Sequence, residues 1–234
     1  MKLPKIYGFN KSSDGGPSPF GVSVFLSGCN MYCPYCLNSK LVEKINLNEI
    51  CLDDILKHII DNNISWVTIS GGEPTIHSGL KNLIMGFFDM GVKINLSTNG
   101  LKPDIVESVI NYLHYVTLDL KTANHDLYLD WTKDGTKHPF DNVLITKSIL
   151  ERESKRRCDD FNYEIRTTVV PKYINELEMY KLIGIIRNDE KWVLQKFRIN
   201  KYVSEEAGIE DDSIAEKFLN LAKNNGKKAE IRYI

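Results

Sequence analysis

The feature that most constrains the fold is a regular alternation of short, β-branched apolar runs with longer segments of helical periodicity. Most of these runs are almost continuously apolar, as parallel strands buried on both faces are. Regular alternation implies parallel strands with right-handed crossovers, which can close wholly or partly into a barrel. We therefore predict an α/β fold, a partial (β/α)6-type TIM barrel with parallel strands. The expected strands are residues 22–26, 66–69, 92–96, 115–118, 165–170 and 192–194.

The segments between these strands carry apolar stripes that predict helices packed on the sheet. Gly91 and Gly226 follow two helical segments, where a left-handed residue ends a helix. Pro103 stands at the start of another helix, a position that proline favours. The stripes are Ile55, Leu56, Ile59 and Ile60; Leu80, Leu83, Ile84 and Phe87; and Ile214, Phe218, Leu221 and Ala222.

Length and charge narrow the class of protein. A chain of 234 residues fits a single domain, residues 1–234, with a substantial core. Thirty Lys and Arg against thirty-one Asp and Glu give a net charge of -1, so no nucleic-acid partner is expected. No signal peptide pattern opens the chain and no apolar run approaches the roughly 20 residues of a membrane span. We expect a cytoplasmic protein with no membrane partner.

Five cysteines in a reducing compartment favour metal or redox chemistry over disulfides. Cys29, Cys33 and Cys36 crowd into eight residues directly after the first expected strand, whereas Cys51 and Cys158 stand alone and are expected to be small buried hydrophobes. Three thiolates on one loop can hold three irons of a [4Fe–4S] cube, whereas a fully ligated cluster uses four. One iron then stays open to bind a substrate or cofactor.

Three other interpretations of this loop remain open on the residues alone. A structural zinc site, as in a zinc-bound interaction module, needs a fourth ligand, such as Cys51, Cys158 or a histidine. A glutaredoxin-like thiol–disulfide oxidoreductase would use Cys33 and Cys36 with a lowered thiol pKa. An electron-transfer cluster would need a fourth well-placed cysteine.

The spacing Cys29-x3-Cys33-x2-Cys36, with the aromatic Tyr35 before the last cysteine, resembles the motif of the radical S-adenosylmethionine (SAM) enzymes. Gly71, Gly72 and Glu73 follow the second expected strand and resemble the GGE segment of that family. The resemblance implies a [4Fe–4S] cluster on the three cysteines and SAM held partly by the backbone of the GGE segment. Two glycines would let the main chain approach the ligand closely.

Segments along nearly the whole chain resemble the activating enzymes of glycyl radical enzymes, above all the anaerobic ribonucleotide reductase activating group, with pyruvate formate-lyase activating enzyme as a relative. The resemblance implies reductive cleavage of SAM to a 5′-deoxyadenosyl radical, which generates a glycyl radical on a partner enzyme. It also implies a flavodoxin or ferredoxin-type electron donor. A radical SAM enzyme acting on a small molecule is the alternative. The segments are 96–100, 117–121, 166–171 and 192–197.

The same resemblance suggests further SAM-binding residues and no catalytic side chain beyond the cluster-bound SAM. Thr98 and Asn99 belong to one matching segment, and Asp119 and Lys121 match an Asp-x-Lys pair near SAM, its Asp implicated in a cation site. Arg166 is expected to face the SAM pocket or to pair with an acidic residue there. Ser97 replaces an Asp of pyruvate formate-lyase activating enzyme, so the expected cation site loses a carboxylate.

Residues 122–142 form the least regular stretch of the sequence and are expected to be a long loop. Long loops in compact domains are often functional, and loops after barrel strands line the active mouth. We expect this segment to contribute to docking of a protein partner through an exposed Trp131.

Overall fold

The computed structural model describes residues 3–11, 21–45, 47–201 and 203–232 and contains an eight-stranded sheet whose spatial order follows the sequence. β1 pairs with β2 in antiparallel fashion, and every later neighbouring pair is parallel. The strands are β1 (Ile6–Asn10), β2 (Gly21–Leu26), β3 (Trp66–Gly71), β4 (Lys93–Thr98), β5 (Tyr115–Asp119), β6 (Asn162–Val169), β7 (Lys191–Lys196) and β8 (Lys228–Arg232).

The predicted α/β class and the parallel sheet are confirmed, and the six expected strands correspond to β2 through β7. In the described residues β1 and β8 are not paired with each other, so the sheet is an open barrel. Both of these edge strands were missed by the sequence analysis. β8 reads KAEIR, a short run in which charged residues are frequent, as they are in edge strands, and β1 is interrupted by Gly8.

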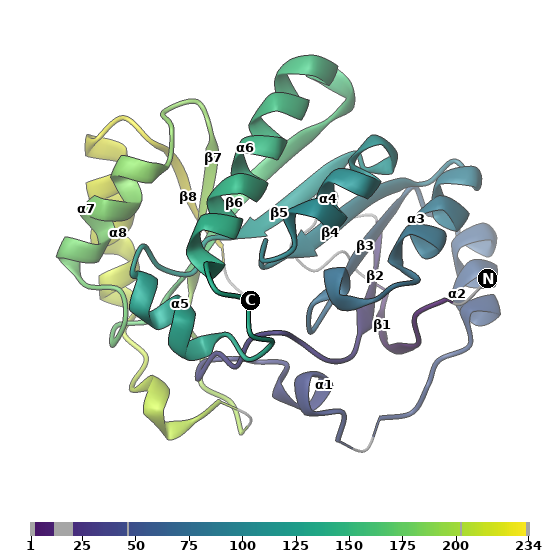
Figure 1. Cartoon of the computed structure of the whole chain (residues 1–234), viewed down its shortest axis with the longest axis horizontal. Helices are drawn as coiled ribbons and strands as arrows, with labels where there is room; N and C mark the ends of the chain where they lie inside the picture. Colours follow the sequence, from purple (N-terminus) through teal and green to yellow (C-terminus); the bar gives the residue numbers. More distant parts are fainter. Residues whose placement is uncertain (1–2, 12–20, 46, 202, 233–234) are drawn as a thin grey trace.

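Helices connect the parallel strands and lie against the curved sheet, with α7 and α8 beside β7 and β8 at one end and α2 at the other (Figure 1). The expected helix ends at Gly91 and Gly226 are confirmed by positive φ angles of 77° and 76°. Pro103 begins α4, as predicted. The helices are α1 (Ser39–Glu43), α2 (Leu52–Asp61), α3 (Leu80–Asp89), α4 (Pro103–Val109), α5 (His125–Trp131), α6 (Pro139–Arg157), α7 (Glu176–Ile185) and α8 (Asp212–Asn224).

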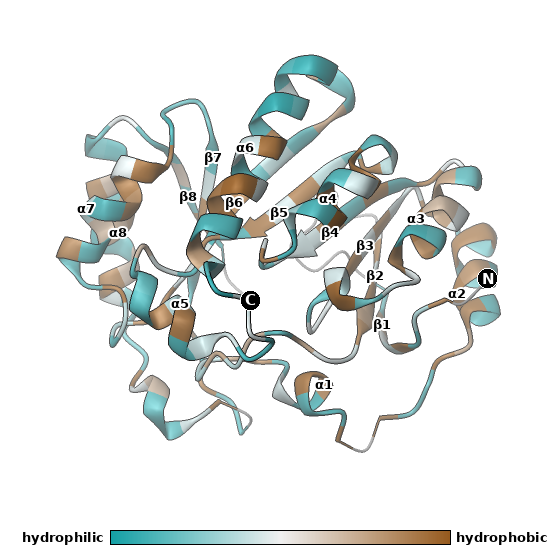
Figure 2. Ribbon diagram, viewed as in Figure 1, coloured by the Kyte–Doolittle hydropathy of each residue, from teal (hydrophilic) through white to brown (hydrophobic). Residues whose placement is uncertain are grey.

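The core lies between the apolar strands and the inward faces of the helices, which Figure 2 shows as brown strands with teal outer helix turns. All four stripe residues of α3 are buried, as expected. The predicted buried face of α2 is partly wrong, because it included Ile60. Ile59 is 3% exposed, but its neighbour Ile60 is 68% exposed, because two consecutive residues differ by about 100° around a helix.

The expected long loop over residues 122–142 is wrong. This part of the chain contains α5, which is capped by the side chain of Asn124, and the first turn of α6. Trp131 is only 5% exposed, which contradicts the expected exposed docking residue. Its ring packs edge-on against Tyr35 and Tyr173, with centroid distances of 5.6 Å and 5.1 Å. The observation that suggested docking through Trp131 is thereby removed.

Two further points concern the lone cysteines and the character of the helices. Cys51 and Cys158 are both exposed, not buried, because Cys51 precedes the first turn of α2 and Cys158 follows the last turn of α6. Among the described helices, none combines the length and apolar character that crossing a membrane requires.

The neighbouring isoleucines of α2 provide a test of the packing. We expect Ile59→Ala to lower the free energy of unfolding by about 2–5 kcal/mol, because it leaves a cavity in the core. The matched substitution Ile60→Ala should change it by less than about 0.5 kcal/mol. Urea unfolding of the two variants measures the difference, and equal losses would contradict the orientation of α2.

Candidate functional site

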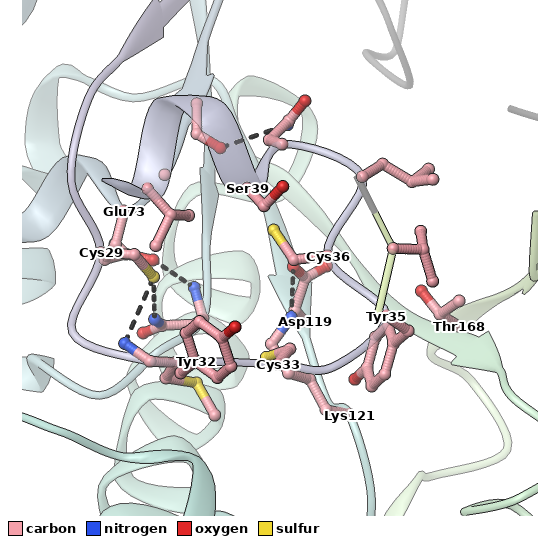
Figure 3. A pocket seen from close by; sticks show the side chains of 18 of the residues that line it. Cys29, Tyr32, Cys33, Tyr35, Cys36, Ser39, Glu73, Asp119, Lys121 and Thr168 are labelled. Carbon is pink, nitrogen blue, oxygen red and sulfur yellow. Dashed lines mark hydrogen bonds and ion pairs between the residues drawn. The ribbon is translucent and has the colours of Figure 1, made fainter. Parts of the chain in front are cut away.

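A large pocket of about 910 Å³ opens at the C-terminal ends of the parallel strands. Its volume is in the range of sites that bind small molecules and cofactors. Figure 3 shows Cys29, Cys33 and Cys36 along its wall, with Glu73 beside Cys29 and Asp119 beside Cys36. The structure brings every sequence-predicted site residue to this one pocket. They are Cys29, Cys33, Tyr35, Cys36, Gly71, Gly72, Glu73, Thr98, Asn99, Asp119, Lys121 and Arg166.

The three cysteines lie on the loop between β2 and α1, and all three are half-buried. In the described part of the chain, no group of three or more His, Cys, Asp or Glu side chains gathers around one point for a single metal ion. Zinc draws its four ligands to one centre at about 2.0–2.3 Å, whereas a cube places each thiolate on a different iron. The three thiols of this one loop match three irons of a cube, whereas a structural zinc site would need a fourth ligand.

The protonation of these thiols argues against thiol–disulfide exchange. Burial raises the pKa of Cys29 to about 12 and that of Cys33 to about 11, and it also raises the pKa of Cys36. A glutaredoxin-like enzyme needs the opposite shift, a lowered pKa that makes the thiolate available. A metal centre supplies the positive charge that deprotonates a buried thiol.

The two glycines of the GGE segment allow β3 to approach the cysteine loop. Gly71 has a φ of +123°, and an added Cβ would lie 2.2 Å from the carbonyl oxygen of Leu26. At Gly72 an added Cβ would lie 1.8 Å from the carbonyl oxygen of Gly28, which directly precedes Cys29. The close approach seen at these glycines is to the backbone of the cysteine loop, whereas the expected approach to SAM stays a prediction. The amides of Gly72 and Glu73 donate to Leu26 O and Gly28 O, both at 2.8 Å.

Glu73 is a buried side chain, and both of its carboxylate oxygens accept hydrogen bonds. Its Oε1 accepts from the Thr75 amide (3.0 Å), the Thr75 hydroxyl (2.6 Å) and the Thr98 hydroxyl (2.7 Å). Its Oε2 accepts from the amide of Asn99 at 2.7 Å. Burial raises the pKa of Glu73, and these hydrogen bonds oppose that rise. The residue therefore joins the ends of β3 and β4.

One side of the pocket carries an ion-pair network that includes Asp119 and Arg166 and reaches the hydroxyl of Ser97. The register of the sheet places Asp119 opposite Arg166, whose Nε donates to Asp119 Oδ1 at 2.7 Å. Arg166 Nη2 also donates to Ser97 Oγ at 3.0 Å, and Lys121 Nζ lies 3.2 Å from Asp119 Oδ2. Burial alone would raise the pKa of Asp119, but Arg166 and Lys121 outweigh it and hold that pKa at about 2. The guanidinium thus contacts both positions at which a cation site was expected.

Tyr35 is 6% exposed and lines the pocket. Its hydroxyl is the one buried side-chain polar atom without a hydrogen-bond partner among the described residues. Burying such a group without a partner costs free energy, so a buried donor of this kind often marks a place where a bound group belongs. The structure therefore holds an unpartnered hydroxyl within the wall of the pocket, on the loop that carries the three thiols.

The segment after α5 supports the cysteine loop through backbone pairing. Met31 and Thr132 form an antiparallel bridge. The amide of Tyr32 donates to Trp131 O at 2.6 Å, and the amide of Lys133 donates to Asn30 O at 3.0 Å. The region that was expected to dock a partner instead holds the three-cysteine loop in place.

The far wall of the pocket was not predicted from the sequence. Thr168 and Gln195 belong to β6 and β7, and the lining residues Phe197, Arg198, Lys201, Val203 and Ser204 follow β7. This segment reaches the cysteine loop, because the amide of Ser204 donates to Pro34 O at 2.9 Å. The one sequence signal for this wall was its position directly after an expected strand, because the segment contains no recognisable motif.

Comparison with known proteins agrees with this geometry. The profile of the Radical SAM superfamily matches residues 23–181. A protein of Methanocaldococcus jannaschii, named as a candidate glycyl-radical enzyme activating enzyme, is 28% identical over 193 residues, which cover 81% of this chain and 78% of the relative. The pyruvate formate-lyase-activating enzyme of Clostridium pasteurianum is 28% identical over 193 residues, which cover 76% and 77%. A radical SAM methyltransferase from Sphaerobacter thermophilus shares the fold, with a TM-score of 0.70, 12% identity and coverage of 99% and 77%.

The close approach at Gly72 predicts a structural cost for any side chain there. Gly72→Ala should lower the melting temperature by at least about 2 °C, because overpacking costs roughly 1–3 kcal/mol. Gly86 is the matched control, since it lies in α3 with open space around an added Cβ. Gly86→Ala should raise the free energy of unfolding by about 0.5–1 kcal/mol. Thermal unfolding of both variants tests this, and a Gly72→Ala protein as stable as the unaltered protein would refute it.

Proposed function

Because the chain belongs to the radical SAM superfamily, whose members use a [4Fe–4S] cluster and SAM, we propose that it is an activase that generates a glycyl radical on a partner enzyme. One observation carries this proposal: three thiols, the GGE segment and three charged residues line the same pocket. The three charged residues, called the charged triad below, are Asp119, Lys121 and Arg166. The names of two relatives at 28% identity support the glycyl radical activity in particular.

Cys29, Cys33 and Cys36 are our proposed cluster ligands. Three features of the pocket fit the group: thiol donors spread along one wall, a volume of about 910 Å³ and the unpartnered hydroxyl of Tyr35. Three ligands leave one iron open, which is where SAM would bind. When bound, the two cofactors supply one-electron cleavage of the SAM sulfonium and abstraction of a hydrogen atom from a substrate.

The residues around the thiols would bind and orient SAM. We assign the backbone of Gly71 and Gly72 to its amino acid part, because this strand end lies directly beside the cysteine loop. Tyr35 would offer its hydroxyl, and Thr98 and Asn99 would shape the wall that Glu73 holds. The protein's contribution is position, electrostatics and exclusion of water.

The charged triad would recognise the anionic end of SAM. Arg166 and Lys121 carry two positive charges against the single carboxylate of Asp119, which leaves a surplus of one positive charge on these three side chains. We infer that Arg166 takes the place of an inorganic cation in this chain, since its guanidinium bridges Asp119 and Ser97. Asp119, Lys121 and Arg166 are therefore proposed as cofactor-binding residues.

The expected partner is the glycine-bearing loop of a glycyl radical enzyme, with a flavodoxin or ferredoxin-type protein as electron donor. The barrel is open because its two edge strands do not pair with each other. An open barrel favours a macromolecular substrate, because it leaves more room for a protein loop to reach the pocket. We place the protein in the cytoplasm, since its five cysteines are all unbridged and persist as thiols in a reducing compartment. A small-molecule substrate is the alternative that experiment must separate.

The ligand assignment predicts which cysteines matter. Cys29→Ala, Cys33→Ala and Cys36→Ala should each lose most of the cluster iron after anaerobic reconstitution, because no fourth thiolate lies in the pocket lining. Cys51→Ala and Cys158→Ala are matched controls and should keep it, since both thiols are exposed outside the pocket. Iron and sulfide analysis with the absorbance of the cluster measures the outcome. Wild-type iron content in Cys29→Ala would refute the assignment.

The activity itself is tested with the reconstituted, reduced protein, SAM and candidate glycyl radical enzymes. We expect SAM cleavage together with the doublet of a glycyl radical in the electron paramagnetic resonance spectrum of one partner. The same partner with its radical-bearing glycine replaced by alanine is the control and should give no doublet. SAM cleavage that is stimulated by a small molecule, with no radical on any partner, would refute the activase proposal.

A further inference from the structure

Asn99 is held in a single orientation beside the cysteine loop. Its backbone amide donates to Glu73 Oε2 at 2.7 Å, and its side-chain Oδ1 accepts from the amide of Leu101 at 3.0 Å. Because an amide is a donor at one end and an acceptor at the other, the Leu101 contact fixes which end is Nδ2. The side chain is 4% exposed, so solvent does not compete for these contacts.

The Nδ2 group of Asn99 carries two hydrogens, and both have acceptors in the cysteine loop. Nδ2 donates to Asn30 Oδ1 at 2.8 Å. It also lies 3.9 Å from Cys29 Sγ, within the range of a hydrogen bond to sulfur. The amide of Met31 approaches the same sulfur at 3.3 Å. In the described part of the chain, Cys29 is the one pocket cysteine whose sulfur accepts from a side chain.

Asn30 is itself fixed from the opposite side. Its backbone carbonyl oxygen accepts from the backbone amide of Lys133 at 3.0 Å, and its side-chain Nδ2 lies 3.5 Å from Asp134 Oδ2. Asp134 in turn forms an ion pair with Lys102 at 2.7 Å. Asn99 and Asn30 therefore form a buried link between the end of β4 and the loop that carries Cys29.

We propose that Asn99 is a positioning residue that orients the Cys29 thiolate and raises the reduction potential of the cluster. This rests on the proposed function, in which Cys29 binds one iron. Hydrogen bonds to cluster sulfurs help to set the potential, because they stabilise the additional negative charge of the reduced state. Since Glu73 holds the amide of Asn99, the segment assigned to SAM and the thiolate are joined by one continuous chain of hydrogen bonds.

Asn99→Ser is the first test. A serine hydroxyl can still accept from the amide of Leu101 two residues later, but it is too short to reach Cys29. We expect normal iron content and a cluster midpoint potential more negative than that of the unaltered protein. SAM cleavage should fall with dithionite and recover with the stronger reductant titanium(III) citrate, which a merely structural defect would not do.

Asn99→Asp is the second variant, since it keeps the shape and the Leu101 contact but replaces the donor with a carboxylate oxygen facing Cys29. Its potential should also be more negative. Asn142→Ala is the matched control, because Asn142 donates to Leu101 O at 3.0 Å and lies outside the pocket. Its potential should be unchanged.

The potentials are measured by redox titration of the reconstituted proteins, followed by electron paramagnetic resonance. An unchanged potential in an iron-replete Asn99→Ser or Asn99→Asp protein overturns this inference alone. Loss of the cluster in both variants, with Asn142→Ala intact, supports the positioning role, provided that the melting temperature of the apoproteins is unchanged. An unaltered protein that assembles no [4Fe–4S] cluster overturns both the proposed function and this inference.

Discussion

The buried carboxylate of Glu73 is the contact on which the arrangement of the pocket depends. A carboxylate that is 1% exposed is costly unless its oxygens are paired, and here Thr75, Thr98 and Asn99 supply all the donors. These donors come from two strand ends that a parallel sheet places side by side. The glycine before Glu73 lies against the cysteine loop, so Gly72 and Glu73 together connect that loop with the ends of β3 and β4.

Much of this arrangement could be predicted from the sequence, because parallel strands bring their carboxyl ends to one edge. The family resemblance identified the thiols after β2, the GGE segment after β3 and Asp119 at the end of β5, and this rule places them in one pocket. The errors have physical causes. Trp131 was wrongly predicted to be exposed. It is buried by Tyr35 and Tyr173, which are far from it in the sequence, so its sequence neighbours gave no sign of these contacts. The link from Asn99 to Asn30 was invisible because it joins residues 69 positions apart.

Charge and burial act against each other throughout the site. Burial raises the pKa of each of the three thiols, and the positive charge of Lys121 opposes that rise at every one of them. Lys121 is held in turn by Asp119, which also holds Arg166. A single acidic residue at the end of β5 thus holds Lys121 beside groups that must become negative when they bind iron.

The backbone bridge between Met31 and Thr132 has a consequence for how proteins built on this plan can diversify. Outer connections of a barrel usually tolerate insertions because they touch little else. Here Trp131, the last residue of α5, and the two residues after it pair with the cysteine loop, so lengthening the chain at that point would displace the thiols themselves. Natural variation in the β5–α6 connection should therefore concentrate beyond residue 133, leaving the residues that pair with the cysteine loop with a fixed spacing.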